Sequence, residues 1–365
     1  MKLINKNLSE FMELNIDKSI ICFGAGKLFQ DMFITMDNCF LDKIQCVVDS
    51  NLKDEKINCN GYWIQRINFG NISNINFKNC VFLITTMYCY EMILKLENIF
   101  ADYDVDCYIY PIMSMMVNNK RSDLISPVRK DIIPKTIHYC WFGWNDIPEK
   151  NKKCIDSWKK ICPDYEILQW NESNYDVKKN KYMYEAYKHG KWGFVPDYAR
   201  LDILYKYGGI YLDTDVEMLN RPDMLMKYDG FMGFQRNYWI NLGLGFGAKK
   251  NNKLIGELRD EYDKISFVDE NGKLNMIASP YYQTVHLKKY ALKCNNEVQN
   301  INGNIILPTD WLDPQGYSGG SVKLTKNTIS IHHYDESWVS NKDLNNSKYS
   351  QIENIIKDYA IFDKN

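Results

Sequence analysis

Apolar runs of strand length alternate with stretches of helical periodicity in the first third of the chain. The runs lie at residues 19–23, 44–48, 81–84 and 108–110. A helical pattern follows the first run through Leu28, Met32 and Phe33, and another spans residues 91–100. Strands that alternate with helices are typical of a parallel α/β sheet. We therefore predict a small Rossmann-like domain over residues 1–115.

This periodicity is lost between residues 113 and 130, where Asn, Lys, Arg, Ser and Pro collect. Such a composition is typical of a linker, which we place at residues 116–131. A proline-led, aromatic-rich strand with the sequence IPKTIHYCWFG then begins at Ile133. It opens a second α/β domain, which we expect to cover residues 132–365.

The stretch 191–217, KWGFVPDYARLDILYKYGGIYLDTDVE, combines several structural signals. Apolar residues at spacings of three and four predict a helix over 195–207. Gly208 and Gly209 end that helix, as glycines often do at a helix C-terminus. A short apolar strand is then predicted at 210–212.

Two acidic residues, Asp213 and Asp215, follow at the end of this strand. Residues two apart in an extended chain point to the same side, so both carboxylates can face one point. Two carboxylates repel each other unless a cation neutralises them, and oxygen ligands suit Mg²⁺ or Mn²⁺. The pattern therefore predicts a divalent metal site that could hold a diphosphate, although isolated Asp-x-Asp triplets also arise by chance on solvated loops.

The charge balance and the composition exclude some classes of function. The 45 basic and 46 acidic residues nearly cancel, so we expect no nucleic-acid partner. The 26 Tyr, 16 Phe and 9 Trp supply a large core and suit stacking on sugars and bases. The 11 cysteines lack metal-type spacing and fit reduced core thiols, as in a cytoplasmic protein. We expect no signal peptide and no transmembrane segment.

The first strand-to-helix turn, Gly24-Ala25-Gly26-Lys27, suggests a second nucleotide site. Glycines there let backbone amides approach a phosphate, and Asp49 could bind ribose hydroxyls. Phe29 stands where a dinucleotide-binding fingerprint has its third glycine. The alternative is a structural or partner-binding module in which the glycines serve tight turning alone.

The segment 191–217 resembles the DXD sugar-transferase signature of glycosyltransferase family 32. That signature runs Asp-x-x-Arg, an apolar helix, Gly-Gly and Tyr-Leu-Asp-x-Asp. The matching residues here are Asp197, Arg200, Gly208, Gly209, Tyr211, Leu212, Asp213 and Asp215. The resemblance implies that Asp215 binds the metal and that Asp213 binds the metal or the ribose. It also implies that Asp197 and Arg200 clamp the donor sugar, with Tyr211 in the donor site. The alternative for Asp197 and Arg200 is an exposed intrahelical pair.

Two other segments are similar to the same family. The family's second domain opens with Ile-Pro-Lys-x-Ile-His-x-x-Trp on the first strand of a GT-A fold, which implies that Trp141 lies near the donor base and His138 near the site wall. Both could instead be core residues.

The family also ends its catalytic domain with His-His-x-x-x-Ser-Trp. By this resemblance Ser337 and Trp338 would donate hydrogen bonds to the β-phosphate. We expect His333 to be the third metal ligand, with His332 as the alternative, since adjacent side chains on a strand point in opposite directions.

The resemblance covers residues 133–338, with three motifs in the family's order. It implies a GT-A type, Mn²⁺- or Mg²⁺-dependent retaining glycosyltransferase that uses a nucleotide-diphosphate sugar, with a UDP-sugar favoured. The acceptor would be a saccharide or a lipid-linked saccharide of a bacterial capsular or surface polysaccharide. The enzyme would lie in the cytoplasm, with peripheral contact at the inner face of the membrane.

Other classes of function stay open at this point. The chain could be a nucleotide-sugar-binding regulatory protein without turnover, which hydrolysis of candidate donors would distinguish from an enzyme. It could also be an oxidoreductase that works through the N-terminal glycines, in which case the first domain should bind a nicotinamide nucleotide. A sugar nucleotidyltransferase is disfavoured, since IPKTIHYCWFG lacks the Gly-rich basic loop usual in that class.

Overall fold

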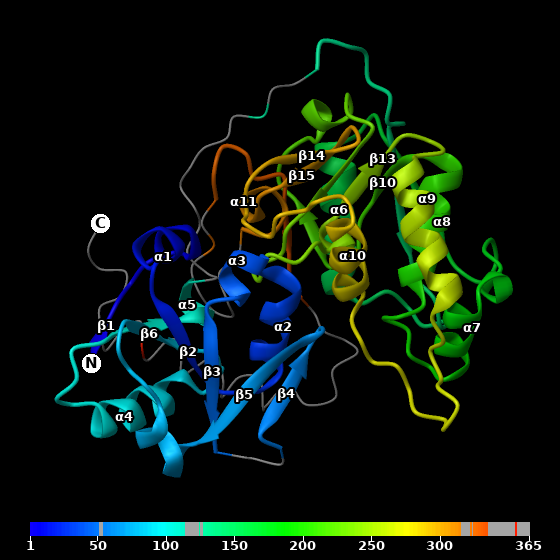
Figure 1. Ribbon diagram of the computed structural model, residues 1–365. Helices are drawn as coiled ribbons and strands as arrows, with labels where there is room; N and C mark the ends of the chain where they lie inside the picture. Colours follow the sequence, from blue (N-terminus) through cyan, green and yellow to red (C-terminus); the bar gives the residue numbers. More distant parts are fainter. Residues whose placement is uncertain are drawn as a thin grey trace. The chain divides into compact units, whose positions relative to one another are not determined.

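The computed structural model describes residues 1–50, 54–113, 124, 127–314, 322, 324–334 and 355. The chain divides into two compact units, each built on its own sheet (Figure 1). The first unit takes in residues 1–113 and the short segment 293–295, and the second takes in the other described residues up to 334. The linker expected at 116–131 lies largely outside the described residues, so the expected domain boundaries stay predictions.

The first unit is a sheet whose strands are parallel except at one edge, with helices in the connections between strands. Its strands are β1 (Lys2–Leu3), β2 (Ser19–Phe23), β3 (Ile44–Asp49), β4 (Lys56–Cys59), β5 (Tyr62–Asn68), β6 (Cys80–Ile84) and β7 (Asp106–Ile109). Its helices are α1 (Leu8–Leu14), α2 (Lys27–Thr35), α3 (Asn38–Leu41), η1 (Phe69–Asn74), α4 (Cys89–Ile99) and α5 (Tyr110–Met113). The strand order is β1-β7-β6-β2-β3-β5-β4. Within the described residues every neighbouring pair is parallel except β4 and β5, which form an antiparallel hairpin at one edge.

Both faces of this sheet are covered, which explains its uniformly apolar strands. Ile20 and Cys22 pack in the cluster that contains α1, α2 and α3. Ile21 and Phe23 point the other way and pack in the cluster that contains α4. Central strands buried on both faces lack polar alternation. The predicted α/β class is confirmed, and β2 has the predicted bounds, whereas the half-exposed β4–β5 hairpin was missed.

The second unit is built on a mixed sheet. Its strands are β8 (Thr136–Cys140), β9 (Glu166–Trp170), β10 (Gly209–Tyr211), β11 (Val216–Met218), β12 (Gly230–Gly233), β13 (Phe246–Ala248), β14 (Gln299–Ile301), β15 (Asn304–Leu307) and β16 (Ser330–His332). Its α-helices are α6 (Glu149–Ile161), α7 (Lys181–Lys188), α8 (Pro196–Tyr207), α9 (Lys253–Glu261), α10 (Ser279–Lys288) and α11 (Thr309–Leu312). Its 3-10 helices are η2 (Val177–Lys179), η3 (Asp223–Leu225), η4 (Leu242–Leu244) and η5 (Tyr262–Lys264).

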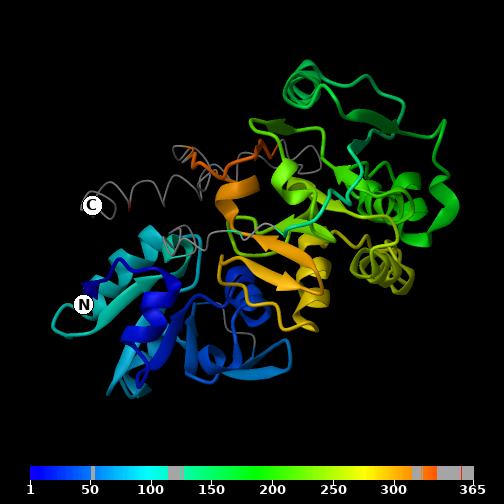
Figure 2. The same cartoon turned by 90° about the horizontal axis from the view of Figure 1, so that it is seen from above.

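The strand order of the larger sheet is β14-β15-β12-β13-β10-β8-β9. β10 runs parallel to β8 and antiparallel to β13. Figure 2 shows β14 and β15 as neighbouring arrows, and their pairing is antiparallel. β11 and β16 form a separate two-stranded ladder. The mixed sheet agrees with the GT-A type expected for this part of the chain.

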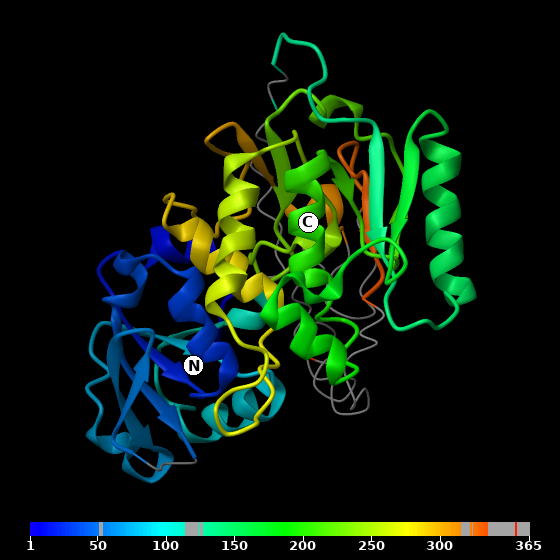
Figure 3. The ribbon, with the colours of Figure 1, turned by 90° about the vertical axis from the view of Figure 1, so that its right-hand side faces the viewer.

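The helix predicted at 195–207 is α8, and its residues 197–204 are all buried, whereas Lys206 and Tyr207 at its C-terminal end are exposed. Asp197, Arg200 and Asp202 are buried together with the apolar residues around them. α9 lies alongside α8, as Figure 3 shows. The helix ends at Gly208, which has φ 70° and whose N–H donates to the Leu204 carbonyl at 2.8 Å. A glycine suits this left-handed conformation, so the local sequence sets where β10 begins.

Candidate metal centre and donor site

The Asp-Thr-Asp triplet lies in a turn directly after β10. β10 ends at Tyr211, and the Val216 N–H donates to the Asp213 carbonyl at 3.1 Å as β11 begins. The chain turns at Thr214 and Asp215. The two carboxylates therefore converge, but the extended-chain explanation from the sequence was wrong, because a turn produces the convergence.

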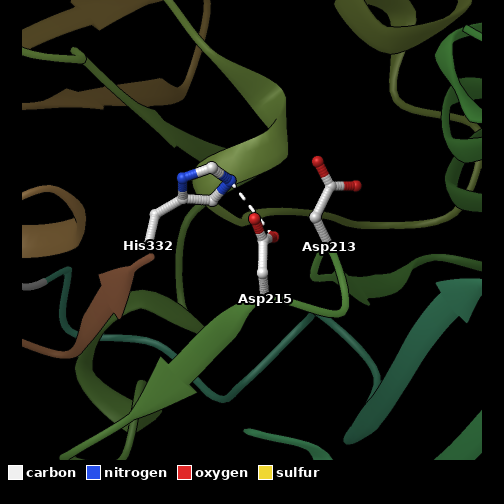
Figure 4. Close-up of side chains that lie close together, drawn as sticks. All are labelled: Asp213, Asp215 and His332. Carbon is white, nitrogen blue, oxygen red and sulfur yellow. Dashed lines mark ion pairs between the residues drawn. The ribbon is translucent and has the colours of Figure 1, made fainter. Parts of the chain in front are cut away.

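A histidine on β16 reaches the same place from a distant part of the chain (Figure 4). His332 Nε2 lies 3.3 Å from Asp215 Oδ1. Ligand atoms of Asp213, Asp215 and His332 all lie within 4.8 Å of one another. In the part of the chain that the structure describes, this is the one such group of three His, Cys, Asp or Glu side chains.

His333, the ligand predicted from the sequence, faces elsewhere. Val216 pairs with His332 across the β11–β16 ladder, and successive side chains on a strand point to opposite faces. His333 Nε2 lies 3.0 Å from Glu217 Oε2, on the other face of that ladder. The prediction is corrected from His333 to His332, because the pairing register selects the inward residue and the sequence does not show that register.

The three side chains fit a divalent cation. Two carboxylates supply hard oxygen ligands and negative charge, and an imidazole nitrogen is acceptable to Mn²⁺. The Asp213 side chain is 32% exposed and that of Asp215 15%, so a ligand can reach them. His332 is buried, and its Nδ1 has no hydrogen-bond partner among the described residues. The group therefore has the composition of a metal centre.

Arg200 on α8 supports Asp213 from the protein interior. Arg200 Nη1 lies 3.5 Å from Asp213 Oδ2, and Nη2 donates to Ser279 Oγ at 3.1 Å. Arg200 also pairs with Asp197, and each of these two residues is 3% exposed. The alternative of an exposed intrahelical pair is therefore wrong. Clamping of the donor sugar by these residues stays a prediction.

The surroundings of Asp213 favour its protonated form. Burial raises the pKa of Asp213, and the neighbouring Asp215 raises it further, while Arg200 and His332 act in the opposite direction. A cation opposite this carboxylate would reverse that preference, since a nearby positive charge stabilises the ionised form. The electrostatics thus agree with a site completed by a cation.

Gly243 leaves the space that the Asp213 carboxylate occupies. A Cβ at this position would lie 2.5 Å from Asp213 Oδ2 and 3.0 Å from Asn241 Oδ1. Asn241 Oδ1 accepts the Gly243 N–H at 2.8 Å and so holds the η4 turn in place. Gly243 has no signal in the sequence, because its role depends on a contact between the turn after β10 and the segment before β13.

Helix α6 holds the acidic turn from the other side. Buried Asn151 donates from Nδ2 to Thr214 Oγ1 at 3.1 Å. Trp158 donates from its indole nitrogen to the Val216 carbonyl at 2.7 Å. These two supporting contacts have no signal in the sequence.

A buried polar cluster lies behind His332. The Tyr334 ring is 4.1 Å from the His332 ring at 76°, and the Arg236 guanidinium is 4.0 Å from the Tyr334 ring centroid. The Tyr334 hydroxyl donates to Asp313 Oδ2 at 2.6 Å, and the Arg236 backbone N–H donates to the same oxygen at 3.0 Å. Burial raises the pKa of Asp313, which has a fully buried side chain. The cluster fixes the ring against which the metal-centre histidine packs.

Two residues, His138 and Trp141, were predicted near the donor site from the first strand of this unit. His138 is a core residue, with Nε2 2.9 Å from the Gly208 carbonyl and Nδ1 accepting from the Trp170 indole at 3.1 Å. Burial lowers the pKa of His138 to about 4, so it is neutral at neutral pH. Trp141 directly follows β8 and is partly exposed, with its indole donating to the Asn145 carbonyl at 2.6 Å. Its contact with a donor base stays a prediction.

Tyr211 supports the site and does not line it. Its side chain is 1% exposed, and its ring packs 5.9 Å from that of Phe246 on β13. The Tyr211 side chain acts to lower the pKa of Asp213, against the larger effect of burial. Ser337 and Trp338, predicted to bind the β-phosphate, lie outside the described residues.

The glycine turn of the first unit is closed by an acidic side chain. Asp49 Oδ2 accepts the Ala25 N–H at 2.7 Å. Gly24 has φ 105°, and a Cβ there would lie 2.9 Å from Thr86 Cβ. These contacts explain Gly24 and Asp49 structurally, whereas the space around Gly26 is open. A second nucleotide site at Gly24, Gly26 and Asp49 stays a prediction.

One family model matches the segment that carries the acidic turn. Residues 148–232 match the family described as "Glycosyltransferase sugar-binding region containing DXD motif". The match spans α6 to β12 and includes Asp197, Arg200, Asp213 and Asp215. It does not include the strand that contributes His332.

Two fungal proteins named for the transfer of mannose or mannosyl groups are similar to part of this chain. An inositol phosphoceramide mannosyltransferase 3 from Schizosaccharomyces pombe is 38% identical over 108 residues, which are 27% of this chain and 29% of that protein. A mannosyl phosphorylinositol ceramide synthase from Saccharomyces cerevisiae is 27% identical over 160 residues, which are 40% of this chain and 39% of that protein. The chain therefore spans well under half the length of these relatives.

Among solved structures, the PaToxG glycosyltransferase is 23% identical, with a TM-score of 0.35, and the alignment covers 43% of this chain and 68% of that one. This similarity is too low to bear on the architecture. The family model at residues 148–232 and the two fungal relatives support the DXD-containing glycosyltransferase family.

Proposed function

We propose that the second unit transfers a sugar from a nucleotide-diphosphate donor to an acceptor hydroxyl in a metal-dependent reaction. The single observation that carries this proposal is the convergence of Asp213, Asp215 and His332 within 4.8 Å at the end of β10. The match of residues 148–232 to a DXD glycosyltransferase model supports it independently.

The three side chains would hold Mn²⁺ or Mg²⁺, which when bound would neutralise charge on the leaving diphosphate. Arg200 keeps Asp213 oriented toward the centre through its contact at 3.5 Å. Asn151 and Gly243 preserve the shape of the acidic turn. These residues prepare the site before the donor binds, so that less reorganisation is needed during transfer.

The identity of the donor and the outcome at the anomeric carbon belong to the proposal as well. The resemblance to family 32 favours a UDP-sugar and retention of configuration. The names of the fungal relatives favour a mannosyl donor for those proteins. We therefore propose a hexosyl transfer, and a screen of UDP- and GDP-sugars should include GDP-mannose.

The acceptor we propose is a saccharide or a lipid-linked saccharide, in the assembly of a surface polysaccharide. The names of the fungal relatives point to a lipid acceptor in those proteins, which favours the lipid-linked alternative. No helix in the described residues is long and apolar enough to cross a membrane.

Substitution of one metal ligand tests the proposal. Asp215→Asn should lower Mn²⁺-dependent donor hydrolysis and transfer by at least about 100-fold, because the site loses a charged ligand. Activity is measured with purified protein across the donor screen, and circular dichroism checks the fold. Asp156→Asn on α6 is the control, since this exposed carboxylate pairs with Lys159 on the surface. Full activity of Asp215→Asn would refute the assignment.

Two other functions predict different results in the same experiment. A regulatory protein without turnover would be stabilised by a nucleotide-sugar and would hydrolyse none. An oxidoreductase would bind a nicotinamide nucleotide in a manner insensitive to Asp215→Asn.

A further inference from the structure

We propose that a basic and aromatic surface of the second unit binds an anionic lipid bilayer. This surface, the interfacial face, consists of Trp144, Trp192, Lys178, Lys188 and Lys191. It carries no residue of the proposed metal centre, and its binding does not depend on sugar transfer.

Trp144 is presented to solvent at a conformational cost. It follows Gly143 in the loop after β8, its side chain is 73% exposed, and its φ is 61°. A positive φ is uncommon for a bulky residue outside glycine, asparagine and aspartate. Such an outlier is maintained only where the surrounding structure holds it, and it often marks a functional position. An exposed indole in this conformation is not explained by core packing.

Trp192 lies beside the same loop. A Cβ at Gly143 would be 3.0 Å from the Trp192 indole, so the ring packs directly against the residue before Trp144. The other side of Trp192 meets Tyr187 of α7, with ring centroids 5.2 Å apart. Trp192 still exposes 39% of its surface. Two indoles on neighbouring loops therefore share one exposed area.

The segment that carries Trp192 is basic, although the whole chain has a formal net charge of −1. Residues 177–192 contain five lysines and one glutamate. That glutamate, Glu185, is turned inward and accepts the N–H groups of Phe267 and Val268 at 2.9 and 3.1 Å. Its other oxygen, Oε1, lies 3.8 Å from Lys181 Nζ, so Lys188 is the lysine of α7 that Glu185 does not pair with.

Three of these lysines have no acidic partner in the part of the chain that the structure describes. Among the described residues no carboxylate lies within ion-pair distance of Lys178, Lys188 or Lys191, whereas Lys179 pairs with Asp202 at 2.6 Å. Lys178 and Lys188 lie 6.0 and 4.9 Å from the centroid of the Tyr184 ring between them. Their stems cover an aromatic surface while their ammonium groups stay in water.

This combination fits a membrane surface better than the alternatives. Indole rings prefer the interface between headgroups and acyl chains, and lysines next to them attract anionic headgroups. A nucleic acid would need a larger basic area than a chain of balanced charge provides. An anionic bilayer uses both features of the interfacial face at once.

Vesicle co-sedimentation tests the proposal with the full chain. We expect binding to phosphatidylcholine vesicles that contain about 30% phosphatidylserine, with much weaker binding to pure phosphatidylcholine and at high salt. Trp144→Ala should weaken the partition coefficient by about tenfold. The triple change Lys178→Gln, Lys188→Gln and Lys191→Gln should weaken it by about 100-fold.

Matched control variants distinguish binding through the interfacial face from non-specific binding of the protein to vesicles. Trp63→Ala removes an equally exposed indole, 67% exposed, from the first unit and should leave binding unchanged. Lys152→Gln with Lys159→Gln removes two lysines of α6 that pair with Glu149 and Asp156, and it should also leave binding unchanged. Asp215→Asn should bind vesicles like the unchanged protein, so failure of the proposed activity is distinguishable from failure of this proposal.

Three results would overturn the proposal. The first is absence of binding to phosphatidylserine vesicles by the unchanged protein. The second is an equal loss of binding in Trp63→Ala and Trp144→Ala. The third is binding to a single-stranded oligonucleotide that depends on the three lysines while vesicle binding does not, which would assign the surface to nucleic acid.

Discussion

At the scale of single residues, one position at the end of β16 separates a residue of the candidate metal centre, His332, from a more exposed residue, His333. His332 Nε2 lies 3.3 Å from Asp215 Oδ1, and His333 Nε2 lies 3.0 Å from Glu217 Oε2. The His332 side chain is 8% exposed and that of His333 28%. Neighbouring residues of identical type can thus have unrelated roles, because strand geometry sends them to opposite faces.

His332→Ala should weaken Mn²⁺ binding by at least about tenfold, since the proposed centre loses one of its three protein ligands. His333→Ala should leave the affinity nearly unchanged, because it removes a partly exposed hydrogen bond with Glu217 that lies away from the two acids. Calorimetric titration of each purified variant with MnCl₂ measures the difference. A larger loss in His333→Ala than in His332→Ala would reverse the assignment.

At the scale of elements, the ends of three elements meet behind His332. Asp313 follows α11, Tyr334 follows β16, and Arg236 follows β12. The fully buried Asp313 carboxylate accepts from the Tyr334 hydroxyl at 2.6 Å. A buried carboxylate that loses a hydrogen-bond donor still bears the free-energy cost of its desolvation. Separation of these three ends would therefore destabilise the fold, because Asp313 would lose its donors while still buried.

Tyr334→Phe should lower the free energy of unfolding by about 1–3 kcal/mol, since Asp313 then lacks its hydroxyl donor while the ring contact with His332 is kept. Urea denaturation followed by tryptophan fluorescence measures the change. The control is Tyr290→Phe, whose hydroxyl bonds the more exposed Glu257 and should matter little. Equal free energies of unfolding for Tyr334→Phe and Tyr290→Phe would show that the hydrogen bond to Asp313 does not stabilise the fold.

At the scale of the whole molecule, the two units have separate cores and separate sources of stability. In the first unit, helix α2 carries an acidic residue, Asp31, whose ionised form is disfavoured by burial. Burial raises the pKa of Asp31 to about 6 from its ordinary value of 3.8, and Lys27 offsets only part of the effect. The native state therefore binds this proton more tightly than the unfolded state does.

The stability linked to this proton is fully present below pH 3.8 and is lost as the pH rises through about 6. Asp31→Asn should therefore stabilise the first unit at pH 7 by about 1–3 kcal/mol, and the gain should shrink toward pH 4. Thermal unfolding at both pH values measures it. Asp106→Asn is the control, because it removes a surface pair with Lys18 and should change stability by less than about 1 kcal/mol. A gain of the same size at both pH values would contradict the burial argument.

Much of the fold could be predicted because its signals are local. The apolar run of β2, the helical spacing in α8 and the glycine stop at Gly208 each depend on a few consecutive residues. The β4–β5 hairpin was missed because its strands are half-exposed, with Trp63 67% exposed. Edge strands of this kind lack a clear apolar run.

For the site, the sequence by itself determined that two acids follow a strand and that a pair of histidines occurs downstream. Tertiary structure alone decided that His332 faces those acids and that Asp197 and Arg200 are buried beside them. It also decided that Gly243 and Asp313 matter to the site. The physical reason is that strand register and side-chain packing join segments more than 100 residues apart, such as Asp215 and His332, and no local pattern records these contacts.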